Sequence, residues 1–140
     1  MGKNLKMNGL HDGNFEGFVY LIINYSLPNW VKIGFSKDPE DRIRRLGTAV
    51  PTPFVIYRAW ATDNMRGAEA ICHRLLDSLR APSGREFFVI KTGVEIQTYE
   101  CDYSGEVYEV PSWPVDDLAD WLENEVQRQG VIFESAFFCE

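Results

Sequence analysis

The chain has 140 residues, of which 45% are hydrophobic, and this length and composition suit one packed domain with an extension. No apolar run approaches the roughly 20 residues that a membrane helix needs, and the N-terminal residues hold no secretory signal, so we expect a cytoplasmic protein without a membrane partner. The three cysteines, Cys72, Cys101 and Cys139, are an odd count without CxxC spacing, which disfavours a disulfide framework and a zinc site.

The net charge of −7 is spread unevenly along the chain. Residues 15–92 hold 11 basic and 8 acidic residues, whereas residues 93–140 hold 1 basic and 12 acidic residues. This asymmetry predicts three parts: an N-terminal tail (1–14), an α/β domain (15–92) and an acidic hairpin-plus-helix extension (93–140). The alternative is that the acidic residues form only a solvated surface that aids solubility.

Two strands and a helix open the domain. Residues 17–24 are rich in β-branched and aromatic residues, and residues 30–36 alternate apolar and polar side chains, so both are predicted to be strands. The turn between them is too short for a crossover, which makes the pair antiparallel. A helix should then begin at Pro39, with Asp38 as its N-cap, and end at Gly47.

A third strand (53–61), a second helix (62–80) and a short strand (86–90) follow. Asp63 is the candidate N-cap of this second helix. Its apolar side chains share one face, because they recur at helical spacing: Ile71, Cys72, Leu75, Leu76 and Leu79.

The acidic third is predicted to hold a hairpin and a helix. The hairpin covers residues 94–110 with its turn at 103–105, and the helix covers residues 115–129 and ends at Gly130. Residues 131–138 are too apolar to remain exposed and should form a strand or pack on the core. The apolar face of the helix holds Leu118, Trp121, Leu122 and Val126. The fold class is therefore α+β, a small, mostly antiparallel sheet flanked by helices.

Several short motifs occur in a fixed order on this framework. They are "GFVY" on the first strand, "KIG" on the second, an arginine eight residues after that glycine, "AEAICH" on the second helix and then "SGREFF". The ordered set resembles the GIY-YIG nuclease superfamily, in its short branch of phage and bacterial proteins named after a bacteriophage open reading frame. The resemblance covers about residues 15–90 and leaves the acidic third without a counterpart.

The resemblance implies a metal-dependent endonuclease that hydrolyses DNA phosphodiester bonds with Mg²⁺ or Mn²⁺. It places the first-motif tyrosine at Tyr20, the second-motif tyrosine at Lys32, the arginine at Arg42 and the metal-binding glutamate at Glu69. Lys32 departs from the family pattern. Glu86 lies near the position of a later asparagine and is a second candidate metal ligand.

Each residue type suits phosphodiester hydrolysis. A carboxylate such as Glu69 suits Mg²⁺, which keeps most of its waters, and Arg42 can grip phosphate oxygens with two N–H groups. Tyr20 would hydrogen-bond the attacking water, or accept its proton if nearby cations lower its pKa. Lys32 would act as an ammonium beside a phenolate or, as a neutral amine, as the base itself.

The remaining candidates have a functional and a structural interpretation. His73 is either a proton donor or a structural hydrogen-bonding residue, and Arg44 and Arg45 either contact DNA phosphates or are solvated. The structural interpretation of Lys32 is a guard of an edge strand against aggregation, and that of Arg42 is a pair with Asp38 on the helix surface. The four tryptophans, Trp30, Trp60, Trp113 and Trp121, are interpreted as core residues in preference to base-stacking platforms.

Two classes of function are carried forward. The first is an active DNA endonuclease in which Tyr20, Lys32, Arg42 and Glu69 converge on one site. The second is a module with weak or lost catalysis that binds DNA or a protein partner. In that case residues 93–140 would form a regulatory or DNA-mimicking surface that weakens DNA binding.

Overall fold

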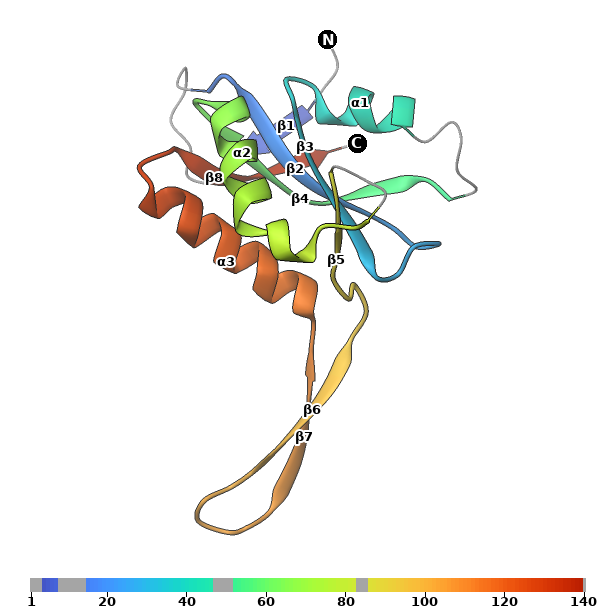
Figure 1. The fold of residues 1–140 in the computed structure, drawn as a ribbon, viewed down its shortest axis with the longest axis vertical. Helices are drawn as coiled ribbons and strands as arrows, with labels where there is room; N and C mark the ends of the chain where they lie inside the picture. Colours follow the sequence, from blue (N-terminus) through green and yellow to red (C-terminus); the bar gives the residue numbers. More distant parts are fainter. Residues whose placement is uncertain (1–3, 8–14, 47–51, 83–85, 140) are drawn as a thin grey trace.

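The structure is a computed structural model and describes residues 4–7, 15–46, 52–82 and 86–139. Its centre is an antiparallel sheet of six strands in the order β1-β8-β4-β2-β3-β5, and a separate sheet pairs β6 with β7 (Figure 1). The strands are β1 (Asn4–Met7), β2 (Gly17–Asn24), β3 (Trp30–Ser36), β4 (Phe54–Thr62), β5 (Phe87–Val89), β6 (Glu95–Glu100), β7 (Val107–Ser112) and β8 (Phe133–Cys139). The predicted α+β class, with an antiparallel sheet, is confirmed.

Helices cover both faces of the central sheet. α2 (Met65–Leu75) and α3 (Pro114–Arg128) lie against each other on one face, and the 3₁₀ turn η2 (Asp77–Leu79) follows α2 (Figure 1). α1 (Pro39–Leu46) lies on the opposite face. None of the helices in the described part of the chain is both long and apolar enough to cross a membrane.

The central strand β2 is buried along its whole length because both of its faces are covered. Val19 and Leu21 point into the core that α2 and α3 close. Tyr20 and Ile22 point to the other face and pack with Ile43 of α1. Neighbouring β2 residues therefore serve two different layers, and Tyr20 belongs to the layer of α1.

Several predicted boundaries are confirmed. The Asp38 side chain accepts a hydrogen bond from the Asp41 amide at 3.2 Å and so begins α1. The predicted end of that helix, Gly47, lies outside the described residues. Gly130 follows α3 with a φ of 83°, a conformation that glycine adopts without a steric penalty. Cys72 and Cys101 are free thiols, as expected.

Two predictions about the second helix are wrong. Asn64, and not Asp63, begins α2, because its side chain accepts a hydrogen bond from the Gly67 amide at 3.0 Å. Leu79 falls in η2 and is exposed, because α2 already ends at Leu75. Residues 4–7, within the predicted tail, form β1 beside β8, a pairing too distant in sequence to be foreseen.

The apolar face predicted for α3 is rotated. Val115, Ala119, Leu122 and Val126 are its buried residues, and Leu118 is only partly buried. Trp121 is 42% exposed, so its interpretation as a core residue is wrong. Trp60 is fully buried, whereas Trp113 is 45% exposed.

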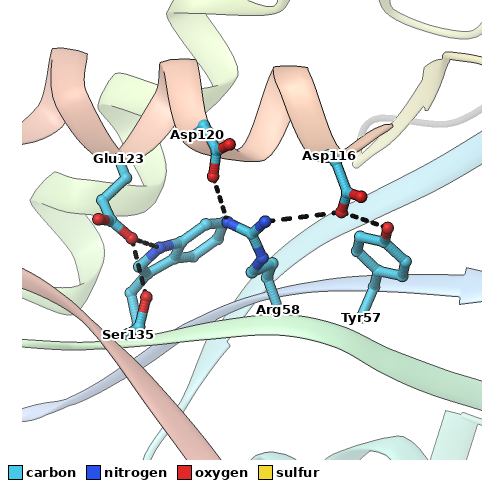
Figure 2. Close-up of polar contacts among 7 residues, drawn as sticks. Tyr57, Arg58, Asp116, Asp120, Glu123 and Ser135 are labelled. Carbon is cyan, nitrogen blue, oxygen red and sulfur yellow. Dashed lines mark hydrogen bonds and ion pairs between the residues drawn. The ribbon is translucent and has the colours of Figure 1, made fainter. Parts of the chain in front are cut away.

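The C-terminal part of the acidic third is built into the core. β8 pairs with β4 in the central sheet, and α3 lies across β4 (Figure 2). Asp116 accepts a hydrogen bond from the Tyr57 hydroxyl, and Asp120 accepts one from Arg58 Nη1 at 2.9 Å. Glu123 Oε1 accepts hydrogen bonds from Trp60 Nε1 at 2.8 Å and Ser135 Oγ at 2.9 Å. The carboxylates of α3 thus hold the helix on the sheet.

Candidate functional site

A pocket of about 460 Å³ lies beside the C-terminal half of β3. It is lined by Tyr20, Phe35, Ser36, Asp38, Asp41, Arg42, Arg45, Glu69 and Glu86. A larger hollow of about 850 Å³ lies between α1, β4 and β8, but Arg44 is the sole predicted site residue that borders it. The smaller pocket is therefore the candidate site, because it gathers the predicted chemical groups.

The pocket forms where β3 loses its outer neighbour. β5 pairs with β3 from Trp30 to Lys32, and the Ile33 amide still donates a hydrogen bond to the Glu86 carbonyl at 3.1 Å. From Gly34 onward, the described strand pairing of β3 is with β2 alone. Side chains from both faces of the sheet can meet at such an open edge.

Tyr20 reaches this edge by crossing over a glycine. Tyr20 and Gly34 are directly opposite each other in the β2–β3 register. A Cβ atom added at Gly34 would lie 2.5 Å from the Tyr20 hydroxyl, so a larger residue there would displace the ring. The glycine of the "KIG" motif therefore makes room for the tyrosine of the "GFVY" motif.

The environment of Tyr20 keeps its hydroxyl protonated. Burial raises the pKa of Tyr20 above its usual value of 10.0, and a hydrogen bond with Arg42 opposes this rise without cancelling it. Since an arginine can only donate, the phenolic oxygen accepts this hydrogen bond. Tyr20 therefore presents a neutral phenol beside Arg42 at physiological pH.

Glu69 reaches the same pocket from α2, on the opposite face of the sheet from Tyr20. Its side chain is 15% exposed, and burial raises the pKa of Glu69, an effect that nearby His73 partly offsets. Of the four residues predicted to converge, Tyr20, Arg42 and Glu69 line the pocket and Lys32 does not, and the three come from elements on both sides of the sheet.

His73 does not line the pocket. Its Nε2 atom lies 3.0 Å from the carbonyl oxygen of Ile33 and 3.8 Å from Glu69 Oε2. A carbonyl oxygen only accepts, so Nε2 carries the proton and donates it to β3. This contact agrees with the structural interpretation of His73, which fixes α2 against the edge of β3.

Lys32 does not line the pocket but contacts a residue that does. Its side chain is 7% exposed and forms an ion pair with Glu86, whose carboxylate lines the pocket. Because β5 covers β3 at this point, the interpretation of Lys32 as an edge-strand guard is wrong. Lys32 acts on the pocket through the position and charge of Glu86.

The three arginines of α1 occupy different positions. Arg42 lines the pocket next to Tyr20. Arg45 also lines it, with a side chain that is 75% exposed and an ion pair to Asp41 at 3.1 Å. Arg44 pairs with Asp41 as well but faces the larger hollow. The structure thus brings Arg42 and Arg45 into the site and leaves Arg44 beside it.

Sequence reasoning missed three polar residues of the pocket, Ser36, Asp38 and Asp41. The sequence predicts Asp38 as a helix cap and as a surface partner of Arg42, but not as a residue of the site. Asp41 could have been linked to the site by its spacing, because it precedes Arg44 by three residues and Arg45 by four, which predicts contact on a helix.

The pocket fits a cation that takes few protein ligands. Glu69 and Glu86 come from separate elements and both line it. In the part of the chain that the structure describes, no group of three or more histidine, cysteine or acidic side chains could hold a metal ion. Mg²⁺ suits such a place because it keeps several waters and binds through one or two carboxylates, whereas zinc usually takes three or four protein ligands.

Comparison with known proteins gives one match. The sequence model of the T5orf172 domain matches residues 17–123, which is more than half of the chain. This is a different family from the one predicted from the motifs, so the assignment to the GIY-YIG nuclease superfamily is not supported. No curated protein and no solved structure matches the chain.

Proposed function

The chain belongs to the T5orf172 domain family, a nuclease-like, DNA-binding family, and from this premise we propose a divalent-metal-dependent DNA endonuclease. The supporting observation is that Tyr20, Arg42, Glu69 and Glu86 come from four separate segments and line one pocket. Hydrolysis of a phosphodiester needs groups that hold the phosphate, groups that orient the attacking water, and carboxylates that bind a metal ion, and these four residues include all three kinds.

Arg42 is proposed to hold the scissile phosphate. A guanidinium offers several N–H donors in one plane, so Arg42 can hydrogen-bond Tyr20 and still present donors to a phosphate oxygen. Charge develops on the phosphoryl oxygens during hydrolysis, and a donor already fixed in place stabilises that charge without reorganising. Arg45, at the rim of the same pocket, would contact a neighbouring phosphate of the strand, and Arg44 lies close by on the same helix.

Tyr20 is proposed to orient the attacking water. Because burial raises the pKa of Tyr20, the hydroxyl keeps its proton near neutral pH and is a poor general base. A neutral phenol can still donate one hydrogen bond and accept others, which suffices to hold a water molecule in line with a phosphate. The phenolate considered from the sequence is therefore the less favoured form.

Glu69 and Glu86 are the residues that would hold Mg²⁺ or Mn²⁺. Bound there, such an ion would acidify water and neutralise phosphate charge. Glu69 is a partly buried carboxylate with a raised pKa, so a positive charge beside it would offset the cost of its burial. Lys32 forms an ion pair with Glu86 and orients that carboxylate, which agrees with an electrostatic role for Lys32 and not with a role as the base.

Metal-dependent nicking of supercoiled plasmid tests this proposal. We expect nicking with Mg²⁺ or Mn²⁺, none after chelation, and a loss of at least about a hundredfold in Glu69→Ala, since that variant lacks a carboxylate of the pocket. Arg42→Lys should lose activity on a similar scale, because the charge remains but the planar fork is lost.

The matched control is Asp117→Asn, which removes one exposed carboxylate from α3, away from the pocket. It should nick plasmid as the wild type does. Equal activity in Glu69→Ala and the wild type, with both proteins folded by circular dichroism, would contradict the role of Glu69.

A further inference from the structure

The hairpin formed by β6 and β7, here called the arm (residues 95–112), extends away from the central sheet (Figure 1). Its two strands pair only with each other among the described strands, from Glu95 with Ser112 to Glu100 with Val107. A two-stranded hairpin with both faces in water is marginally stable by itself. Most strand residues of the arm are exposed, because no described element packs on its faces.

The arm exposes apolar side chains that a solvated loop does not need. Ile96 is 58% exposed and Val107 is 66% exposed, and both lie within strands. Tyr99 and Tyr108 form a cross-strand pair with ring centroids 6.5 Å apart, and both rings are largely exposed. Exposed apolar side chains therefore lie on both faces of this projecting hairpin, which is unusual for a surface that faces only water.

The register divides the arm into two different faces. One carries the tyrosine pair. The other, here called the acidic face, carries Ile96, Thr98, Glu100, Val107, Glu109 and Pro111. Glu100 and Glu109 are diagonal neighbours on this face, about 7–8 Å apart at the backbone, and they repel each other. No basic residue within the arm offsets these two charges.

The charge of the arm restricts what can bind it. Residues 95–112 include five acidic and no basic residues. DNA is repelled by such a surface, and two arms would repel each other, so neither a nucleic acid nor a second arm is the expected occupant. A polypeptide surface with lysine or arginine beside apolar side chains complements both properties.

We propose that the acidic face of the arm is a docking surface for a basic surface of another protein. The arm leaves the sheet near Trp30, where the Ile90 amide bonds the Asn29 carbonyl, whereas the pocket lies at the other end of β3, beside Gly34. Four residues of strand separate these points by about 13 Å. The base of the arm and the pocket therefore lie at opposite ends of β3. This inference does not depend on the nuclease proposal.

Binding of a designed peptide to the full chain tests the inference. The probe is a capped octapeptide that alternates lysine and valine, and the control peptide alternates glutamate and valine. Amide chemical shifts of the ¹⁵N-labelled chain locate the binding site, and fluorescence anisotropy gives the affinity. We expect shifts confined to the arm with the lysine peptide and none with the glutamate peptide.

Two double variants with equal net charge distinguish binding at the acidic face from attraction of the peptide by the net charge of the chain. Glu100→Gln with Glu109→Gln removes both carboxylates of the acidic face, whereas Asp102→Asn with Glu106→Gln removes two from the turn of the same arm. The first pair should weaken binding at least about fivefold, and the second less than about twofold, with the difference shrinking as salt is raised.

Three results would overturn the inference. The first is an equal loss of affinity for the lysine peptide in both double variants, which would mean that net charge alone attracts the peptide. The second is that the lysine peptide shifts amides outside the arm or does not bind. The third is self-association of the chain in sedimentation that the variant pair Glu100→Gln and Glu109→Gln abolishes, because the occupant would then be a second copy.

Discussion

The helix α3 and the arm carry charge of the same sign and use it differently. In α3, Asp116, Asp120 and Glu123 accept hydrogen bonds or form ion pairs with β4 and β8 (Figure 2). In the arm, Glu100 and Glu109 face solvent beside exposed apolar side chains. A net charge summed over residues 93–140 hides this division, so the acidic third has no single role.

The largest expected difference between the two regions is in folding. A chain that ends at Ile90 loses α3 and β8, which cover the core around Trp60. We expect it to show no cooperative unfolding transition. A chain in which residues 96–111 are replaced by Asn-Gly, a sequence suited to a tight hairpin turn, should melt close to the wild type. Thermal unfolding followed by circular dichroism makes the comparison, and a cooperative transition in the first chain would contradict it.

Single carboxylates should show the same contrast on a smaller scale. Glu123→Ala leaves the buried Trp60 N–H without its acceptor and should lower the free energy of unfolding by about 1–3 kcal/mol. Glu109→Ala in the arm should change it by less than about 0.5 kcal/mol. Urea denaturation gives both values. Equal effects would mean that the arm packs against the core in solution.

Alkaline pH should reveal the contact between α3 and β4. Burial and the hydrogen bond with Asp116 raise the pKa of Tyr57 to about 12. Because the folded value lies above the unfolded value of 10.0, this contribution to stability is complete below pH 10 and is lost as the pH rises towards 12. Tyr57→Phe should be less stable than the wild type at pH 9, and the gap should narrow by pH 11.5. Melting temperatures at both pH values test this, and a constant gap would contradict it.

The smallest expected effect is that of the arm on DNA affinity. The sequence alone suggested that the acidic region shields the basic site, but the arm leaves the sheet at the opposite end of β3 from the pocket. At about 0.15 M salt the Debye length is about 8 Å, shorter than that separation. Replacing residues 96–111 should therefore tighten DNA binding less than about threefold at low salt and not at all at 0.15 M. A larger gain in fluorescence anisotropy would restore the shielding idea.

Local patterns in the sequence predict local structure well in this chain. The strands around Tyr20 and Lys32 and the capped start of α1 at Pro39 follow from alternation and capping residues. Of the site residues that the motif spacing predicted, Tyr20, Arg42, Glu69 and Glu86 line the pocket, whereas Lys32 and His73 do not, and the predicted family is wrong.

What the sequence could not predict depends on contacts between distant segments. The burial of Lys32 comes from pairing with β5, which lies more than 50 residues later. The partners of Asp116 and Glu123 lie on β4 and β8, so an acidic helix looks like a solvated one until the sheet is known. Trp121 was misplaced for a related reason: α3 meets the sheet through Ala119 and Leu122, and periodicity alone does not fix that rotation.

Plasmid cleavage by three proteins side by side tests the central claim, which is that the pocket beside β3 carries the chemistry and the arm does not. The proteins are the wild type, Glu69→Ala and the chain with residues 96–111 replaced by Asn-Gly. With Mg²⁺ or Mn²⁺ at 0.15 M salt, we predict that the arm variant nicks at the wild-type rate and that Glu69→Ala does not nick measurably. Cleavage retained in Glu69→Ala, or abolished in a folded arm variant, would contradict the claim.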